Sequence, residues 1–161
     1  MSTHSSLFDA SALVKVFSIE PGSNVVKQYF DACPCKYTTP FCFYEAMNAL
    51  KGKWKYKQQL SLEEYYKATF ELTAWHGAWS KDLNDIDFSD PAVSARTRQL
   101  AEKFQLDLSD AFQILSVQQG AHSIFVNDSA TVLVTADNGL AAAARSEGIR
   151  VWNVMLEPAP A

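Results

Sequence analysis

Residues 131–135 (TVLVT) form an unbroken run of β-branched and aliphatic side chains, and this run constrains the fold more than any other feature of the chain. A strand with one face in water alternates apolar and polar residues, whereas a strand covered on both faces does not. The run therefore predicts a buried strand of a parallel sheet. The other expected strands are residues 5–9, 37–39, 83–88 and 149–154.

Helical periodicity and capping residues predict helices between these strands. Ser61 with Glu64 has the pattern of a capping box, and Asp90 with Pro91 has that of an N-cap followed by a first-turn proline. The expected helices are residues 11–19, 23–32, 41–50, 61–80, 90–104, 107–119 and 138–147. Strands that alternate with helices predict an α/β fold, a three-layer α/β/α sandwich with a mainly parallel central sheet.

The bulk properties narrow the class of protein. The 161 residues, 48% of them hydrophobic, suit one domain over residues 1–156 with a disordered tail at 157–161. The net charge of −4 argues against binding nucleic acid by overall electrostatics, so work on a polyanion would need local cations or bound metals. An odd set of three cysteines without an apolar leader favours the cytoplasm, and no apolar run is long enough to span a membrane.

Four acids are candidates for chemistry. Asp9, Asp110 and Asp137 fall where an expected strand ends or a helix begins, and each has an ordinary explanation because Asp is a preferred N-cap. Asp107 and Asp110 could likewise form a capping pair. Glu45 lies among apolar residues in 41–50, which predicts a partly buried carboxylate that needs either an ion-pair partner or a metal.

Taken together, the four acids predict a metal site. Ligands of an open parallel sheet bind outside the carboxyl ends of the strands, where Asp9 and Asp137 must project. Carboxylates that converge there would repel one another without cations between them, and hard oxygen ligands suit Mg²⁺ or Mn²⁺. Sites of this kind hydrolyse phosphodiesters.

Four segments resemble the motifs of the PIN-domain family, in particular its VapC-type toxin ribonucleases. Residues 7–15 (LFDASALVK) are similar to the opening strand and turn, with Asp9 followed two residues later by Ser11. Residues 44–50 (YEAMNAL) match the second acid, Glu45. Residues 106–115 (LDLSDAFQIL) resemble the third motif at Asp110, and residues 133–140 (LVTADNGL) resemble the fourth at Asp137. The segments occur in the family's order and spacing.

The resemblance implies a metal-dependent endoribonuclease in which Asp9, Glu45, Asp110 and Asp137 are the catalytic metal ligands for Mg²⁺ (or Mn²⁺). Ser11 would hydrogen-bond a ligand or the attacking water. The implied reaction is in-line attack of water on an RNA phosphodiester, leaving 5′-phosphate and 3′-hydroxyl ends. It also implies the toxin of a type II toxin–antitoxin module, a homodimer whose cognate antitoxin covers the acidic crevice.

Two other features concern binding. Residues 51–57 (KGKWKYK) alternate lysines with aromatic residues, which is typical of a surface that grips an RNA backbone and stacks a base, although the aromatics could instead pack on the domain. The RNA-binding candidates are Lys15, Lys51, Lys53, Trp54 and Lys55. The aromatic residues of 61–80 exceed what a small core requires and predict an exposed patch for self-association or for a partner.

The remaining alternatives come from other classes. Cys33, Cys35 and Cys42 do not have the spacing of a zinc site, which we therefore reject. A catalytically silent PIN-fold scaffold would have no need for four mutually repelling acids. A phosphotransfer receiver would want paired acids after its first strand, and Asp9 has no acidic neighbour.

Overall fold

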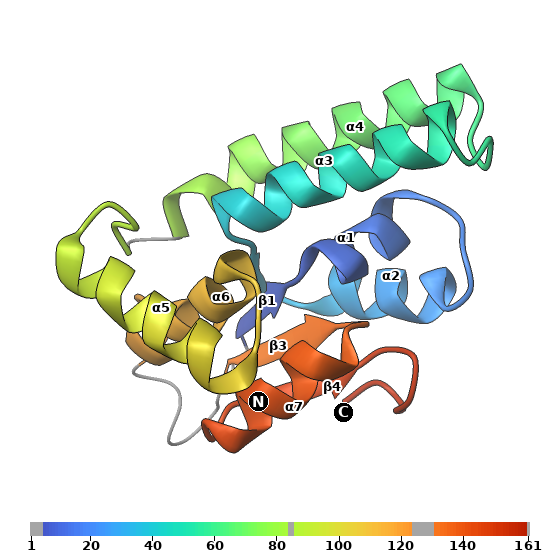
Figure 1. Ribbon diagram of the computed structural model, residues 1–161. Helices are drawn as coiled ribbons and strands as arrows, with labels where there is room; N and C mark the ends of the chain where they lie inside the picture. The colour runs from blue at the N-terminus through green and yellow to red at the C-terminus, as the bar shows by residue number, and fades with distance from the viewer. Residues whose placement is uncertain (1–4, 84–85, 124–130, 161) are drawn as a thin grey trace.

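A four-stranded parallel sheet forms the centre of the protein, for which a computed structural model describes residues 5–83, 86–123 and 131–160. The strands are β1 (Ser5–Phe8), β2 (Cys35–Tyr37), β3 (Val132–Thr135) and β4 (Arg150–Asn153), in the order β2-β1-β3-β4. Helices cover both faces of the sheet (Figure 1), so the predicted three-layer α/β/α sandwich is confirmed.

The helices of the described chain follow the predicted caps. Ser61 and Glu64 form the reciprocal capping box. Asp90 directly precedes Pro91, and its carboxylate accepts the backbone N–H groups of Ala92 and Val93. After α4 the chain continues through a π-helical turn, η1 (His76–Ser80), and a short 3₁₀ turn, η2 (Lys81–Leu83). The α-helices are α1 (Ala10–Phe17), α2 (Ser23–Ala32), α3 (Pro40–Lys55), α4 (Leu62–Trp75), α5 (Pro91–Phe104), α6 (Leu108–Gln119) and α7 (Asn138–Ser146).

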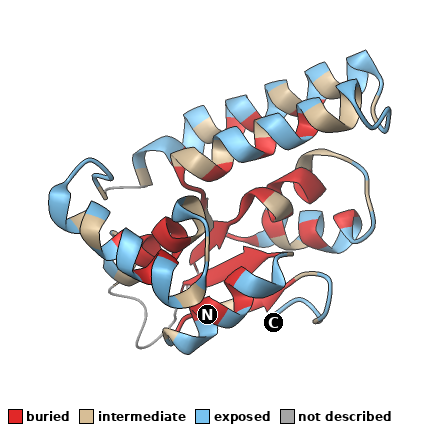
Figure 2. Ribbon diagram, in the orientation of Figure 1, coloured by how far each residue is buried: buried red, intermediate tan, exposed pale blue. Residues whose placement is uncertain are grey.

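Two apolar cores lie on opposite faces of the sheet, because successive strand residues point to opposite sides. Phe8 and Val134 pack with α1, α2, α3 and α4, whereas Leu7 and Leu133 pack with α5, α6 and α7. All four residues of β3 are buried (Figure 2), as the unbroken run 131–135 predicts for a strand covered on both faces.

The pair α3 and α4 corrects one expectation. The apolar residues of 41–50 predict a buried helix, but α3 runs on to Lys55 and packs on α1 and α4, which leaves part of its remaining surface exposed (Figure 1). Tyr44 is 68% exposed, and Glu45 beside it is exposed as well, so the expected burial of that carboxylate is wrong.

The expected strand at residues 83–88 is also wrong for the part that the structure describes. Leu83 ends η2, residues 84–85 lie outside the described residues, and 86–88 form no strand. The physical reason is Asp87, whose carboxylate accepts the N–H and hydroxyl of Ser89 and folds the chain into a turn before α5.

The C-terminal segment contacts the domain as far as Glu157, one residue beyond the expected end of the domain at residue 156. Glu157, assigned to the tail on sequence grounds, accepts a hydrogen bond from Asn153 N and pairs with Arg145, while its carbonyl accepts from Trp152 Nε1. Elsewhere in the described chain, none of the helices combines the length and the apolar character that crossing a membrane would require.

Candidate metal centre

The strand order makes the boundary between β1 and β3 the topological switch point of the sheet. The chain leaves β1 toward β2 on one side, and later passes from β3 to β4 on the other. Their carboxyl ends are aligned, with Phe8 opposite Val134, so this is the switch point where ligands of such sheets bind. Asp9 follows β1 directly, and Asp137 follows β3 at a distance of two residues.

Asp9 is the buried centre of the site, with 4% of its surface exposed. It occupies the N-cap position of α1 but makes no side-chain cap, so the ordinary capping explanation does not hold for it. Its Oδ2 accepts the hydroxyls of Ser11 at 2.6 Å and Thr135 at 2.8 Å, and its Oδ1 accepts Gln113 Nε2 at 2.9 Å. The Cys42 thiol faces the same Oδ1 at 3.9 Å. These donors compensate the cost of burying the carboxylate.

Gln113 is a site residue that the sequence analysis missed. It is completely buried on α6, and its Nε2 donates both to Asp9 and, at 3.1 Å, to Asp110 Oδ1. Its Oε1 is buried without a hydrogen-bond partner among the described residues. The one available signal was its spacing, three residues after Asp110 and therefore on the same helical face.

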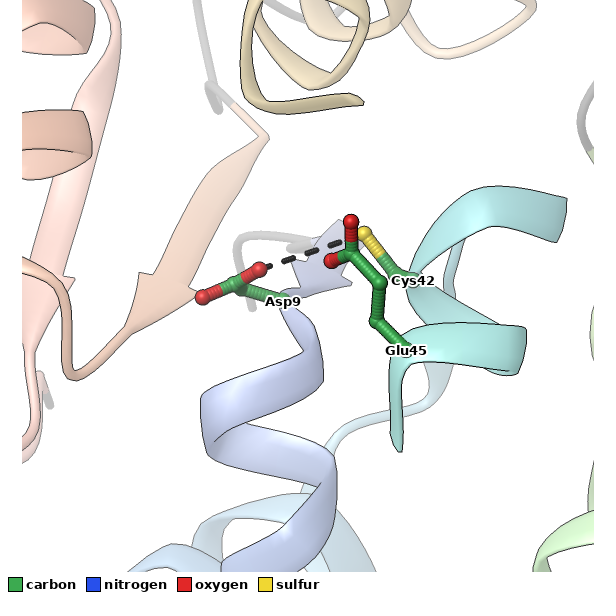
Figure 3. A group of neighbouring side chains, drawn as sticks. All are labelled: Asp9, Cys42 and Glu45. Atoms are coloured by element: carbon green, nitrogen blue, oxygen red, sulfur yellow. Dashed lines mark hydrogen bonds between the residues drawn. The ribbon is translucent and has the colours of Figure 1, made fainter. Parts of the chain in front are cut away.

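Glu45 approaches Asp9 from α3. Ligand atoms of Asp9, Cys42 and Glu45 all lie within 4.8 Å of one another, and Figure 3 shows the Glu45 carboxylate turned toward the other two side chains. Ser109 donates its hydroxyl to Glu45 Oε1 at 2.6 Å, which ties the end of this exposed side chain to α6.

The pKa of Asp110 is raised by burial and by the acids around it. Loss of solvation raises its pKa from the ordinary 3.8 to about 7, helped by the negative charges of Asp9, Asp137, Glu45 and Asp107, in that order. The charges of the other three predicted acids therefore all reach Asp110. Mutual repulsion of this kind is relieved by a proton or by a cation.

Asp137 also serves as an ordinary helix N-cap. Its Oδ1 accepts Leu140 N at 2.8 Å and caps α7, and its side chain is exposed. The structure thus places it at the rim, where its charge reaches Asp110 while one of its oxygens serves the helix.

The donor set fits a hard divalent cation. The ligand atoms that converge are carboxylate oxygens of Asp9 and Glu45 and the sulfur of Cys42. Burial and the nearby Asp9 charge raise the pKa of the Cys42 thiol well above its usual range, which disfavours the soft thiolate form. The unpartnered Gln113 Oε1 adds a buried oxygen on the amide that links Asp9 to Asp110. Asp9, Glu45 and Asp110 are the residues that would hold Mg²⁺ or Mn²⁺, with Asp137 at the edge.

Two of the lysine candidates pair with Glu20. Lys15 is buried, and its Nζ donates to Glu20 Oε1 at 2.7 Å, while Lys53 Nζ pairs with Glu20 Oε2 at 2.6 Å. Trp54 stacks on Tyr65 of α4, with ring centroids 5.0 Å apart and an angle of 9°. The aromatic part of this stretch packs on the domain, and Lys51 and Lys55 remain exposed.

The cysteines do not gather into one group. Cys33 donates to the Cys35 carbonyl and Cys35 lies 3.6 Å from His122 Nε2, whereas Cys42 faces Asp9. Among the described residues, the cluster that could hold a metal contains Cys42 only with two acids.

Comparison with known proteins supports the fold. No protein-family model matches this chain, and no curated protein matches it. A solved structure, "Crystal structure of PAE2754 from Pyrobaculum aerophilum", superimposes with a TM-score of 0.58 at 21% sequence identity, covering 95% of this chain and 94% of that one. At this identity the similarity shows a shared fold. The class defined here is an α/β/α domain with a carboxylate cluster at the switch point of its sheet.

Proposed function

We propose that this chain is a metal-dependent endoribonuclease that hydrolyses RNA phosphodiester bonds. The observation that supports this proposal best is geometric: ligand atoms of Asp9, Cys42 and Glu45 lie within 4.8 Å of one another, and Gln113 Nε2 donates to both Asp9 and Asp110. The raised pKa of Asp110, about 7, agrees with it. A fold that uses these side chains only for structure has no need to hold four carboxylates against their mutual repulsion. A phosphodiester nuclease has that need, because it must bind cations beside an anionic substrate.

In this proposal the chain's own residues build and orient the site. Asp9 is fixed by Ser11, Thr135 and Gln113, so its two oxygens cannot rotate freely. Bound Mg²⁺ or Mn²⁺ supplies a Lewis acid for the phosphate and lowers the pKa of water. Gln113 keeps the Asp9 and Asp110 carboxylates at one spacing through its shared amide group.

The biological setting that we propose is the toxin of a type II toxin–antitoxin module acting on RNA in the cytoplasm. Leu62, Tyr66 and Phe70 recur every four residues on α4 with 44%, 62% and 74% of their surfaces exposed, which supports self-association into a homodimer. An antitoxin would cover the acidic crevice.

Cleavage of structured RNA by purified protein, with Mg²⁺ or Mn²⁺ and with EDTA, tests the enzymatic proposal. We expect cleavage to need the metal and to disappear in Asp9→Asn and Asp110→Asn. Asp107→Asn is the matched control, because Asp107 makes no side-chain cap and asparagine serves equally well at an N-cap. Cleavage that persists in Asp9→Asn would exclude this site.

Induction of the gene alone in a bacterial host tests the toxin proposal. We expect growth arrest with the native chain and normal growth with Asp9→Asn at the same protein level. Normal growth with both, together with no cleavage in vitro, would favour a scaffold with a PIN-like fold.

A further inference from the structure

An apolar pocket opens directly beside the candidate metal centre. Its volume is about 260 Å³, just below the range for drug-sized ligands, and its wall is mostly apolar. The side chains that line it come from α3, α5, α6 and the turn before α5: Phe41, Phe88, Thr97, Arg98, Ser109 and Phe112 are the main ones.

The pocket and the metal centre share the same two helices. Phe41 lies on α3 one turn before Glu45, and Phe112 lies on α6 two residues after Asp110. Ser109 joins the two regions, because it lines the pocket while its hydroxyl donates to Glu45 Oε1 at 2.6 Å. One side chain therefore separates an apolar wall from a carboxylate of the proposed catalytic site.

Three phenylalanine rings form the apolar wall. Phe41 meets Phe88 and Phe112 edge to face, with centroid distances of 5.1 and 5.2 Å, and Phe88 lies 6.4 Å from Phe112. Phe112 is buried, but Phe88 leaves 52% of its surface exposed. An aromatic ring held by two others and open to solvent is a rigid platform for stacking.

The charge at the rim is complementary to a nucleotide. Arg98 is an exposed lining residue, and it forms no salt bridge with a carboxylate among the described residues. A guanidinium can pair with a phosphate or stack on a base. A cation at the rim of an apolar pocket can contact the phosphate of a nucleotide whose base lies in the pocket. The backbone of that nucleotide would then run across Ser109 toward the proposed metal centre.

We propose that this pocket, defined by Phe41, Phe88, Arg98 and Phe112, binds a nucleobase of single-stranded RNA next to the phosphate that is cleaved. This inference rests on the proposed ribonuclease function and specifies its substrate: an unpaired nucleotide, whose base is free to leave the stack. The base stacks on Phe88, and Arg98 contacts the adjoining phosphate.

The test compares two fluorescent oligonucleotides of equal length, a single-stranded oligouridylate and a chain whose riboses carry no bases. Binding is measured by fluorescence anisotropy in the Asp9→Asn background, which keeps the RNA intact. We expect the chain with bases to bind at least about fivefold more tightly, the lower end of what one stacked base contributes.

Phe88→Leu should remove this preference, because leucine keeps the apolar bulk and hence the fold but lacks a π-face. Arg98→Gln should weaken both oligonucleotides and reduce the salt dependence of binding. Ile19→Ala is the control, since Ile19 is an exposed apolar residue that lies outside this pocket and outside the α4 surface proposed for self-association. Thermal denaturation of each variant confirms folding.

Equal preference in Phe88→Leu and in the parent protein would overturn the proposal. It would also be overturned if neither oligonucleotide bound and Phe88→Leu instead dissociated a dimer, because the pocket would then hold a second copy of the chain. Failure of the ribonuclease proposal gives another result: the base preference remains, but the native chain does not cleave RNA. Cleavage that Phe88→Leu leaves unchanged refutes the pocket alone.

Discussion

Replacement of Asp110 by asparagine should stabilise the protein when no metal is present. The Asp110 pKa is about 7 in the folded chain and 3.8 when unperturbed, so the folded state holds its proton more tightly than the unfolded state. Stability is therefore lost as the pH rises from about 4 to about 7, and the loss is complete above pH 7. An asparagine side chain at this position has the same shape without the charge, and its Oδ1 can still accept from Gln113 Nε2.

The magnitude follows from the two pKa values. Their difference corresponds to an upper limit of about 4 kcal/mol, but Asp110 is only half-buried, so solvent screening reduces the expected gain to about 1–2 kcal/mol at pH 8. For a chain of this size the melting temperature should rise by roughly 3–6 °C. At pH 4 the two proteins should melt together.

Differential scanning fluorimetry of EDTA-treated protein at pH 4 and pH 8 measures this effect. Saturating Mg²⁺ should then reverse the order, because it stabilises the native chain by about 2.7 kcal/mol at one hundred times its dissociation constant and leaves Asp110→Asn nearly unchanged. Asp107→Asn, at the N-cap of α6, should have a smaller effect, because the Asp107 charge is the last of the contributions to the raised Asp110 pKa. The reasoning is refuted if Asp110→Asn melts at or below the native temperature at pH 8 without metal.

Three further predictions concern separate parts of the molecule. Glu20→Gln should cost about 2–4 kcal/mol at pH 7, because it leaves the buried Lys15 without its ion-pair partner, while the Pro21 carbonyl remains an acceptor. Asp31→Asn, in the exposed pair with Lys27, should cost under about 0.5 kcal/mol in the same urea titration. Burial raises the Glu20 pKa, but Lys15 and Lys53 outweigh burial, so the pKa is lowered overall. The stabilisation by the Glu20 carboxylate is therefore present above pH 4.5 and is lost as the pH falls through the lowered pKa. An effect of Glu20→Gln that is undiminished at about pH 3 would contradict this ion pair. Gln113→Leu should weaken Mg²⁺ binding roughly 10–100-fold by calorimetry without unfolding the chain, and unchanged affinity would remove Gln113 from the site. Phe70→Glu should shift the native chain from dimer to monomer in sedimentation, and a native chain that is monomeric at every concentration would contradict the homodimer.

Local signals gave the correct elements wherever one side chain or one period decides them. The capping box at Ser61, the cap at Asp90 and the continuous run of β3 appear in the structure as expected. The strand expected at residues 83–88 is absent from the part of this range that the structure describes, because the Asp87 side chain competes with the backbone for hydrogen bonds and favours a turn. Glu45 was placed on the correct helix, but its burial depends on which neighbours cover that helix.

Apart from the strand expected at residues 83–88, the sequence alone determined the order of strands and helices along the chain, the parallel sheet and the positions of Asp9 and Asp137 beyond strand ends. These features are encoded within a few residues, as periodicity, caps and turns. The tertiary structure decided which distant side chains meet: Gln113 bridges Asp9 and Asp110, and Lys15 is buried against Glu20 rather than exposed. The contact between Gln113 and Asp9 joins residues 104 positions apart. No local pattern records such a contact, because it arises only when the two layers of helices close on the sheet.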